Sequence, residues 1–481
     1  MSLIIPANSA SAAGGYAVDN SCRFNDGSSD NLSRTTETPT NAKKYTFSVW
    51  VKRSNIGAAN AKIFGVQGAS ANDQNMMEFN ADYLWWAQST SSGQAYRLKS
   101  NRKFRDPSAW LNIVVAYDST QGTANNRIRM YINGVEETSF SSRTNPSANL
   151  DSLINSSVSA NAGRTLRLGR TGDNGSQYFD GYMSEVCFID GLQLDPTSFG
   201  EFDEDSGIFK PIDVSGLTFG NNGFYLETKQ SGTSQNSSGL GADTSGNDNH
   251  FAVNNLTAID QSTDTCTNNF ATMNPLHSGA VTFAEGNLQV SRSGGSSWLN
   301  SLSTFAPTSG KWYVELKVNS VGSNGLNMGF ANFDLSNLQN VTSGPGEDAT
   351  SAGLYSNGGP IFYASGTTFA TVGSPSGIMQ LAMDLDNGFL YWGKDGTWLN
   401  SANPESGATG TGGLALSNLS TGGSYGIALA ARNGGDVSFN FGSPPFAISS
   451  GNTDGNGYGN FEYAVPSGYY SLNTKNLSEY G

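Results

Sequence analysis

The sequence predicts an all-β protein built from two antiparallel β-sandwich domains in series, joined by an extended connector. Hydrophobic residues make up 37% of the 481 residues and aromatic residues 11%, which is enough apolar side chain for packed cores. Short segments in which apolar and polar residues alternate recur along the chain, and most are separated by Gly, Asn, Asp or Ser. This pattern is typical of sandwiches or barrels, and single sandwiches commonly reach roughly 200 to 250 residues.

The first set of strands begins at Tyr45–Arg53, where every second residue from Tyr45 to Val51 is apolar. A period of two indicates a strand. Asn133 and Gly134 supply two positions that tolerate positive φ, so a tight hairpin is expected there. The remaining strands expected in this set are Lys62–Gln67, Met76–Phe79, Leu84–Ala87, Trp110–Tyr117, Arg127–Val135, Thr165–Leu168 and Tyr182–Ile189.

A second set of strands follows Val281. Its clearest members are Lys311–Val318, Asn327–Ala331, Ile378–Asp384, Gly388–Trp392, Ser424–Ala430 and Asp436–Phe441. The sequence between the two sets of strands is polar and rich in turn residues. Because it also contains apolar residues such as Phe224 and Phe251, it is expected to lie along a domain surface. The predicted organisation is 1–18 docking segment, 19–215 sandwich, 216–279 extended connector, 280–447 sandwich and 448–481 tail.

The formal net charge is −14, and both halves of the chain are acidic. Such a chain is a poor partner for nucleic acid or an anionic membrane surface. One basic run interrupts this pattern, at Arg97, Lys99, Arg102, Lys103 and Arg105. A solvated strand and turn is the favoured interpretation of this run, and contact with a polyanion is the alternative.

The chain contains no stretch of about 20 apolar residues, and its N-terminus lacks the basic region of a signal peptide. We therefore expect neither a leader nor a membrane anchor. Cys22, Cys187 and Cys266 are far apart and form no C-x-x-C pair. They are expected to be free thiols in a protein that folds in a reducing cytoplasm.

Two segments, Trp110–Phe140 and Leu166–Pro196, resemble the second half of a laminin G or concanavalin A-like domain. The shared features are a Trp-led strand, an Asn-Gly hairpin and a strand that opens with Phe-Asp-Gly, and the resemblance covers about residues 19–210. Residues 280–447 resemble a SPRY domain through GKWYVELKV, NMGFANFD, MDLDNGFLYWGKDGTWL and VSFNFGSPPF. The resemblance implies jelly-roll sandwiches in both parts.

Further segments resemble virion structural or tail-fibre-like proteins of marine tailed bacteriophages. They are LIIPANS with SCRFNDGSSDNLSR, FIDGLQLDPTSFGEFDEDSGIFKP, TDTCTNNFATMNPL and PSGYYSLNTKNL. This resemblance implies a non-catalytic protein of the virion surface, either a tail fibre or host-adhesion component, or alternatively a head decoration or head-fibre protein. The implied partners are other virion proteins and host surface glycans, and a homo-oligomer, with a trimer favoured. The chain carries no fibrous repeat, which counts against a long autonomous fibre.

A glucanase-like enzyme is the remote alternative, because concanavalin A-like glucanases use a Glu-x-Asp-x-x-Glu pattern. The nearest match here contains Glu201, Asp203 and Asp205, with Ser206 in place of the third carboxylate. A solvated acidic loop is the favoured interpretation, and His250 and His277 offer little for other catalytic arrangements. We therefore predict no enzymatic activity.

Calcium is the only cofactor considered, because laminin G-type sandwiches can hold it in rim loops. The candidate ligands are Asp118, Asp173, Asn174 and Asp180, although turn geometry is the favoured role for such residues.

For a saccharide, the candidates are Trp85 and Trp86, since adjacent strand residues point to opposite faces and an exposed indole stacks on a sugar ring. Trp398 beside Asp395 is the second choice. Packing is the favoured role for each of these tryptophans.

Overall fold

The computed structural model describes residues 15–67, 72–156, 165–172, 177–278, 280–334, 343–419 and 422–481. These residues belong to two compact units, which we call the first domain (10–267) and the second domain (268–481). The fold is nearly all β, as predicted, and each domain is a sandwich of predominantly antiparallel sheets. Each domain has its own hydrophobic core and is described separately below.

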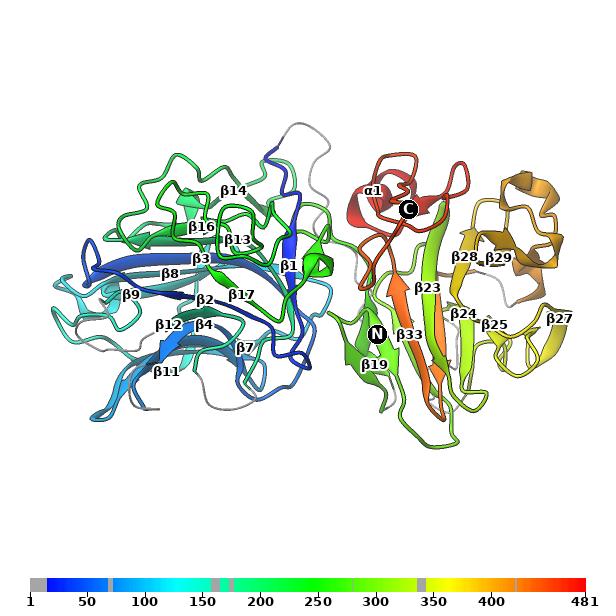
Figure 1. Ribbon diagram of the computed structural model, residues 1–481, viewed down its shortest axis with the longest axis horizontal. Helices are drawn as coiled ribbons and strands as arrows, with labels where there is room; N and C mark the ends of the chain where they lie inside the picture. The colour runs from blue at the N-terminus through cyan, green and yellow to red at the C-terminus, as the bar shows by residue number, and fades with distance from the viewer. Residues whose placement is uncertain are drawn as a thin grey trace. The chain divides into compact units, whose positions relative to one another are not determined.

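Two large sheets form the body of the first domain, and Figure 1 shows them as two layers. Sheet one contains, in spatial order, β10 (Val135–Glu136), β9 (Ile128–Ile132), β8 (Trp110–Asp118), β3 (Lys44–Arg53), β13 (Gly181–Asp190), β1 (Ser21–Phe24) and β18 (Gln261–Ser262), with β16 (Phe224–Leu226) also paired to β13. Sheet two contains β11 (Phe140–Thr144), β7 (Gly93–Lys103), β6 (Tyr83–Thr90), β5 (Gln74–Asn80), β4 (Ala61–Gln67), β12 (Thr165–Leu168), β2 (Asn31–Thr35) and β17 (Ala252–Asn254).

Aromatic side chains fill the space between these two sheets. The rings of Phe47 on β3 and Phe64 on β4 stack with their centroids 4.1 Å apart. Tyr45 and Trp86 pack beside them, and all four side chains are fully buried. This is the arrangement that alternation predicts, because every second residue of β3 points into the core.

The outer face of sheet one is also covered. Val114 and Cys187 on that face are buried together with Phe199 and Phe219 from the segment that follows β13. This segment includes the small hairpin of β14 (Gly200–Phe202) and β15 (Phe209–Pro211). Sheet one is therefore buried on both sides, whereas the outer face of sheet two carries the polar and aromatic residues described in the next section.

The prediction of an extended connector at 216–279 is wrong for most of that range. Strands β16, β17 and β18 pair with β13, β2 and β1 respectively. Phe251 is fully buried in the core of the first domain. The boundary was misplaced because the apolar residues of this segment are separated by polar turns and show no strand period, although they complete the sandwich.

Most of the predicted N-terminal docking segment, residues 1–14, lies outside the described residues. The remaining part joins the first domain: the Val18 backbone N–H donates to Thr267 Oγ1 at 3.0 Å, and Tyr16 contacts Glu185 and Tyr225.

The second domain also contains two sheets. The first has the order β19 (Met273–Ser278), β22 (Leu299–Ser303), β32 (Tyr425–Ala431), β24 (Leu326–Asn332), β25 (Ser351–Tyr355), β26 (Pro360–Tyr363) and β27 (Thr367–Thr371). The second has β20 (Thr282–Ala284), β21 (Gln289–Ser291), β33 (Gly435–Asn440), β23 (Lys311–Val321), β28 (Ile378–Asp384), β29 (Phe389–Lys394) and β30 (Thr397–Trp398), with β31 (Leu414–Ala415) paired to β29 and β34 (Tyr470–Ser471) to β23.

The predicted tail 448–481 is part of the second domain. Strand β34 runs parallel to β23, and helix α1 (Thr474–Tyr480) follows it, as Figure 1 shows in red. The buried carboxylate of Glu315 accepts hydrogen bonds from the backbone N–H groups of Glu462 and Tyr463 at 2.9 and 2.8 Å. A single buried acid therefore fixes the middle of this segment against the sheet.

Helices are short in the described part of the chain. Besides α1 there are 3-10 turns at Ala124–Asn126, Pro196–Ser198, Ala258–Asp260, Leu399–Ser401, Pro404–Thr409 and Leu416–Asn418. Among the described residues, no helix is long and apolar enough to cross a membrane. The predicted free thiols are confirmed: Cys22, Cys187 and Cys266 are buried and unbonded, and burial raises the pKa of each.

Candidate functional site

Strand β6 points its two adjacent tryptophans to opposite faces of sheet two. Trp86 is fully buried, and its Nε1–H donates to Tyr45 Oη at 3.1 Å in the core. The prediction of Trp86 as a sugar-binding residue is therefore wrong, because no ligand can reach it. Trp85 lies on the outer face and is half-buried, which is the orientation that alternation requires once Trp86 is in the core.

Strand β7 places cations over the aromatic rings of β6. Lys99 pairs directly with Trp85 in the ladder. Lys99 Nζ and Arg97 Cζ each lie 4.7 Å from the Trp85 ring centroid. Lys99 Nζ is also 4.7 Å from the Tyr83 ring centroid, and Lys103 Nζ is 4.8 Å from it. Tyr83, Trp85, Arg97, Lys99 and Lys103 thus form one surface, which we call the cationic–aromatic face.

The five cations of the basic run differ in their partners. Arg102 Nε lies 2.7 Å from Glu137 Oε2, and Arg105 Nε lies 2.9 Å from Asp82 Oδ2. The three cations of the cationic–aromatic face have no carboxylate partner within the described ranges. Their positive charge is therefore not neutralised by the surrounding described residues.

A buried ion pair supports this face from the neighbouring strands. Lys62 Nζ on β4 lies 2.9 Å from Glu78 Oε2 on β5, and the two side chains are 5% and 2% exposed. Glu78 is paired with Trp85 across the ladder.

Within the described part of the chain, the indole N–H of Trp85 and the Nε–H of Arg97 have no hydrogen-bond partner. Both nitrogen atoms are buried, so neither donor is exposed on the surface.

The second tryptophan candidate lies in a different kind of environment. Trp398 on β30 is half-buried and packs edge-on against Tyr313, with ring centroids 6.4 Å apart. Asp395 is exposed, has a φ of 47°, and its Oδ1 accepts the Ile378 N–H at 2.9 Å. Asp395 therefore holds the β29–β30 hairpin, and Trp398 contributes to the packing beside it.

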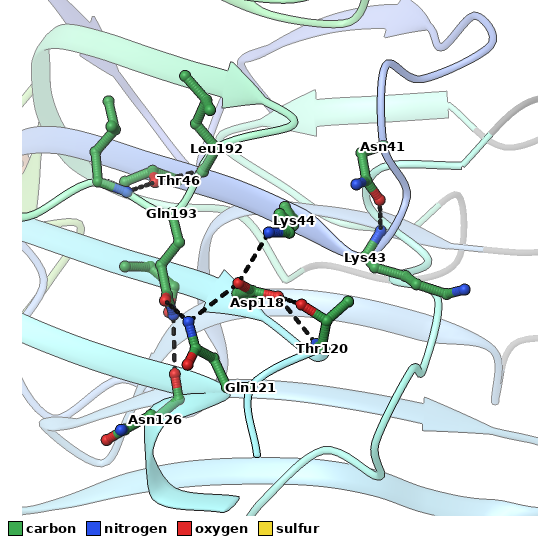
Figure 2. Close-up of polar contacts among 12 residues, drawn as sticks. Asn41, Lys43, Lys44, Thr46, Asp118, Thr120, Gln121, Asn126, Leu192 and Gln193 are labelled. Carbon is green, nitrogen blue, oxygen red and sulfur yellow. Dashed lines mark hydrogen bonds and ion pairs between the residues drawn. The ribbon is translucent and has the colours of Figure 1, made fainter. Parts of the chain in front are cut away.

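The predicted calcium ligand Asp118 is the centre of a polar network at one end of sheet one (Figure 2). Its Oδ1 accepts from the Thr120 N–H at 2.9 Å and Oγ1–H at 2.6 Å, and its Oδ2 accepts from Gln121 Nε2 at 3.1 Å. Lys44 Nζ lies 3.2 Å from Oδ2. Burial alone raises the pKa of Asp118, but the Thr120 hydrogen bonds and Lys44 outweigh it and lower the pKa below its ordinary value.

The same network links three segments of the rim. Gln193 Nε2 donates to the Asn126 carbonyl at 2.9 Å, and Gln121 Nε2 lies 3.3 Å from Gln193 Oε1. The Thr46 hydroxyl donates to the Leu192 carbonyl at 2.9 Å, as Figure 2 shows. The donors and acceptors satisfy one another, so this arrangement fixes the loops at the rim.

The predicted calcium set cannot act together as one site. Asp118 pairs with Lys44 at the start of β3, whereas Asp180 precedes Gly181, which pairs with Arg53 at the end of β3. Nine strand residues separate these positions by about 30 Å. Asp173 and Asn174 lie outside the described residues. Among the residues that the structure does describe, no three His, Cys, Asp or Glu side chains are grouped so that they could hold a metal.

The acidic segment considered for catalysis forms the turn of the β14–β15 hairpin. Asp203 Oδ1 accepts from the Ser206 N–H and Oγ–H at 2.9 Å each, and its Oδ2 lies 3.3 Å from Lys210 Nζ. These hydrogen bonds, with the Ser206 backbone first, lower the pKa of Asp203 to about 2. Glu201 also contacts Lys210, at 3.4 Å. The segment is a solvated, charge-paired turn, as favoured from the sequence.

The first domain is thus a two-layered antiparallel β-sandwich that presents a cationic–aromatic face. Residues 26–192 match the family model of the Concanavalin A-like lectin/glucanases superfamily, a match that spans less than half of the chain. No curated protein shows a significant match.

Several solved structures are similar to parts of the chain. The SPRY domain of human HERC1 is 11% identical, with a TM-score of 0.28, covering 35% of this chain and 96% of that chain. A protein from Bacteroides ovatus described as carbohydrate-binding is 13% identical, with a TM-score of 0.33, covering 50% of this chain and 58% of that chain. A pentraxin from Limulus polyphemus is 15% identical, with a TM-score of 0.26, covering 37% of this chain and 80% of that chain.

Sequence reasoning identified Trp85 and the basic run separately but did not bring them together. The signal was present in β7, where Tyr96 and Leu98 alternate with Arg97 and Lys99. That period orients the cations to one face. It does not show that β7 pairs with β6, because strand pairing is a long-range property of the fold.

Proposed function

We propose that the chain is a non-catalytic carbohydrate-binding protein of a bacteriophage virion surface, acting as a tail fibre or host-adhesion component. The observation that carries this proposal is the half-buried indole of Trp85 on the outer face of sheet two, with cations over its ring. An indole at a partly exposed position offers an apolar plane for the face of a sugar ring. The lectin and glucanase family match of residues 26–192 supports a binding role.

The absence of catalysis is part of the proposal. It is supported by the acidic turn at Glu201 and Asp203, where Lys210 and Ser206 engage the carboxylates. A retaining or inverting glycosidase needs two carboxyl groups flanking a bound sugar bond. The charge-paired turn lacks that arrangement. Release of reducing sugar from a bound polysaccharide would contradict this part of the proposal.

The virion location rests on the sequence resemblance to structural proteins of marine tailed bacteriophages, which extends over nearly the whole chain. Within the particle, we propose that other virion proteins are the assembly partners and that the protein is a homo-oligomer, with a trimer favoured. Immunogold labelling of intact particles with antibodies against residues 280–447 tests the location. Label at the tail is expected; label over the head would favour decoration, and particles without label would refute the virion assignment.

Binding is tested by comparing the full chain with Trp85→Ala on an array of immobilised bacterial polysaccharides. We expect saturable binding by the unsubstituted protein and a loss of at least about tenfold in affinity for the variant, as for a stacking anchor. Tyr178→Ala is the matched control, because Tyr178 is also a half-buried ring of the first domain with a cation, Arg170, 4.7 Å from its centroid. Equal binding by both variants would refute a role for Trp85.

A further inference from the structure

The cations and rings of the cationic–aromatic face alternate along a single row. Arg97 lies over Trp85, Lys99 lies over both Trp85 and Tyr83, and Lys103 lies over Tyr83, with all four distances between 4.7 and 4.8 Å. Residues two apart on one strand are about 6.6 Å apart and point to the same side. The row therefore presents repeated positive charge along an extended line, which suits a linear ligand.

The charge of this row distinguishes it from its surroundings. The whole chain carries a net charge of −14, and the other two cations of the basic run are engaged by Glu137 and Asp82. Three cations on one face without a carboxylate partner among the described residues repel one another. An anionic ligand relieves that repulsion, whereas a neutral ligand leaves it in place.

The positions of the cations also bear on how a sugar reaches the indole. Arg97 and Lys99 both lie over the Trp85 ring, so a neutral pyranose must displace at least one cation–π contact in order to stack. A carboxylated or sulfated sugar compensates for this, because its anionic group accepts hydrogen bonds from the displaced guanidinium or ammonium group.

From these observations we propose that the cationic–aromatic face binds a linear acidic polysaccharide, with carboxylate or sulfate groups held by Arg97, Lys99 and Lys103 and sugar rings against Trp85 and Tyr83. This inference rests on the proposed carbohydrate-binding function and specifies its ligand class. A single-stranded nucleic acid shares the stacking and phosphate chemistry. The lectin and glucanase family match of residues 26–192 favours the polysaccharide, and binding of a nucleic acid is an outcome of the test.

The test uses the full chain and two polymers that differ only in charge, dextran and dextran sulfate, with alginate as the carboxylated counterpart. Binding is measured by biolayer interferometry at about 0.05 M and about 0.5 M NaCl, because screening weakens contacts between exposed charges. We expect dextran sulfate or alginate to bind at least about tenfold more tightly than dextran at low salt, and this preference to shrink at high salt. This salt dependence requires no substitution and so does not depend on the folding of a variant.

The residues are tested with the triple variant Arg97→Gln, Lys99→Gln and Lys103→Gln, which is expected to lose about tenfold or more in affinity for the acidic polymer. The matched control replaces Arg170 and Lys475 with Gln, since these cations lie over Tyr178 and Tyr458 in the same kind of contact. The control is expected to bind as the unsubstituted protein does. A charge-preserving variant, Lys99→Arg with Lys103→Arg, is expected to keep the preference for the acidic polymer.

Three outcomes would overturn the proposal. They are equal binding of dextran and dextran sulfate, equal weakening of the triple variant and its control, or tighter binding of oligodeoxythymidylate than of either acidic polymer. Failure of this proposal is distinguishable from failure of the proposed function. If neutral polysaccharides on the array bind in a Trp85-dependent way while the acidic polymers do not bind, only the ligand class is wrong. If no saccharide of either kind binds, the carbohydrate-binding function itself is wrong.

Discussion

Glu185 is the residue of the first domain in the most unusual environment. It lies inside strand β13 with a φ of 51°, where the pairing register between β13 and β3 shifts. Its carboxylate is buried and accepts hydrogen bonds from the hydroxyls of Tyr225 and Tyr16. The bulge turns this side chain away from the regular alternation, so that it holds the start of the described chain against β16.

The protonation of Glu185 is expected to make the stability of the first domain depend on pH. Burial raises its pKa to about 7, opposed by the Tyr225 hydrogen bond and assisted by nearby Glu227. The contribution of Glu185 to the free energy of unfolding is therefore complete below its unfolded-state pKa of about 4.5. It is lost as the pH rises through the folded-state pKa of about 7, and the loss is about 3 kcal/mol at most. The unsubstituted protein is expected to have a lower melting temperature at pH 8 than at pH 5. This difference is expected to be smaller in the variant Glu185→Gln.

The control for this prediction is Glu204→Gln, which changes an exposed acid of the same domain. It is expected to keep the pH dependence of the unsubstituted protein. Lys229 also lies near this cluster and lowers the pKa of Glu185, so it is left unchanged in both variants. An identical pH dependence in Glu185→Gln and the unsubstituted protein would show that Glu185 does not titrate in this range.

At the scale of single residues, the sequence could indicate that two adjacent side chains of a strand point to opposite faces of the sheet. It could not indicate which distant residues lie beside them. Alternation placed one of the two adjacent tryptophans on the outer face, and the structure identifies it as Trp85. The sequence also could not indicate which loops share an end of the sheet, and this determines whether Asp118 and Asp180 of the predicted calcium set lie near each other. Asp118 and Asp180 are both turn residues by sequence, yet the register of β3 places them at opposite ends.

At the scale of elements, many of the longer strands with a clear period of two were predictable, and the shortest ones were not. The predicted strands are confirmed, including the hairpin at Asn133 and Gly134, whose φ values are 48° and 76°. Strands β16, β17 and β18 contain only two or three residues each, too few to show a period. They are positioned by pairing with distant strands and by apolar residues such as Phe251 that fill the core.

Phe251 provides a direct test of this element. Its ring is fully buried and packs edge-on against Phe224, with centroids 4.8 Å apart. Phe251→Ala is therefore expected to lower the free energy of unfolding of the first domain by about 3 to 5 kcal/mol. Gln230→Ala is the control, because Gln230 lies in the same predicted connector and in the same domain but is exposed. It is expected to change the stability by about 0.5 kcal/mol or less.

Chemical denaturation followed by tryptophan fluorescence measures both variants. A connector that merely lies along the surface predicts similar small effects for the two substitutions. Equal stability of Phe251→Ala and Gln230→Ala would therefore contradict the assignment of this segment to the core of the first domain.

At the scale of the whole molecule, the two sandwiches follow from composition and period, but their boundaries do not. Each domain is completed by chain that looks like a linker or a tail. In the first domain, Lys52 Nζ lies 2.7 Å from Asp264 Oδ2, with both side chains at most 2% exposed. In the second, Asp454 Oδ2 accepts from the Ser471 N–H at 2.9 Å. The ligand is even less predictable, because a sandwich fold supports many functions and the site determines which.

Fragments with two alternative sets of boundaries test this completion. Residues 10–267 and 268–481 are each expected to unfold cooperatively on heating, because each retains its sheets and core. Residues 19–215 are expected not to fold. That fragment lacks β16, β17 and β18 and leaves Lys52 as a buried charge without Asp264, and breaking such a pair alone costs about 3 to 5 kcal/mol. Residues 280–447 lack β19, β34 and α1, and leave Glu315 without two of its backbone donors. Cooperative unfolding of both shorter fragments, measured by circular dichroism at the same temperatures as the longer ones, would show that the terminal segments are accessory to the sandwiches.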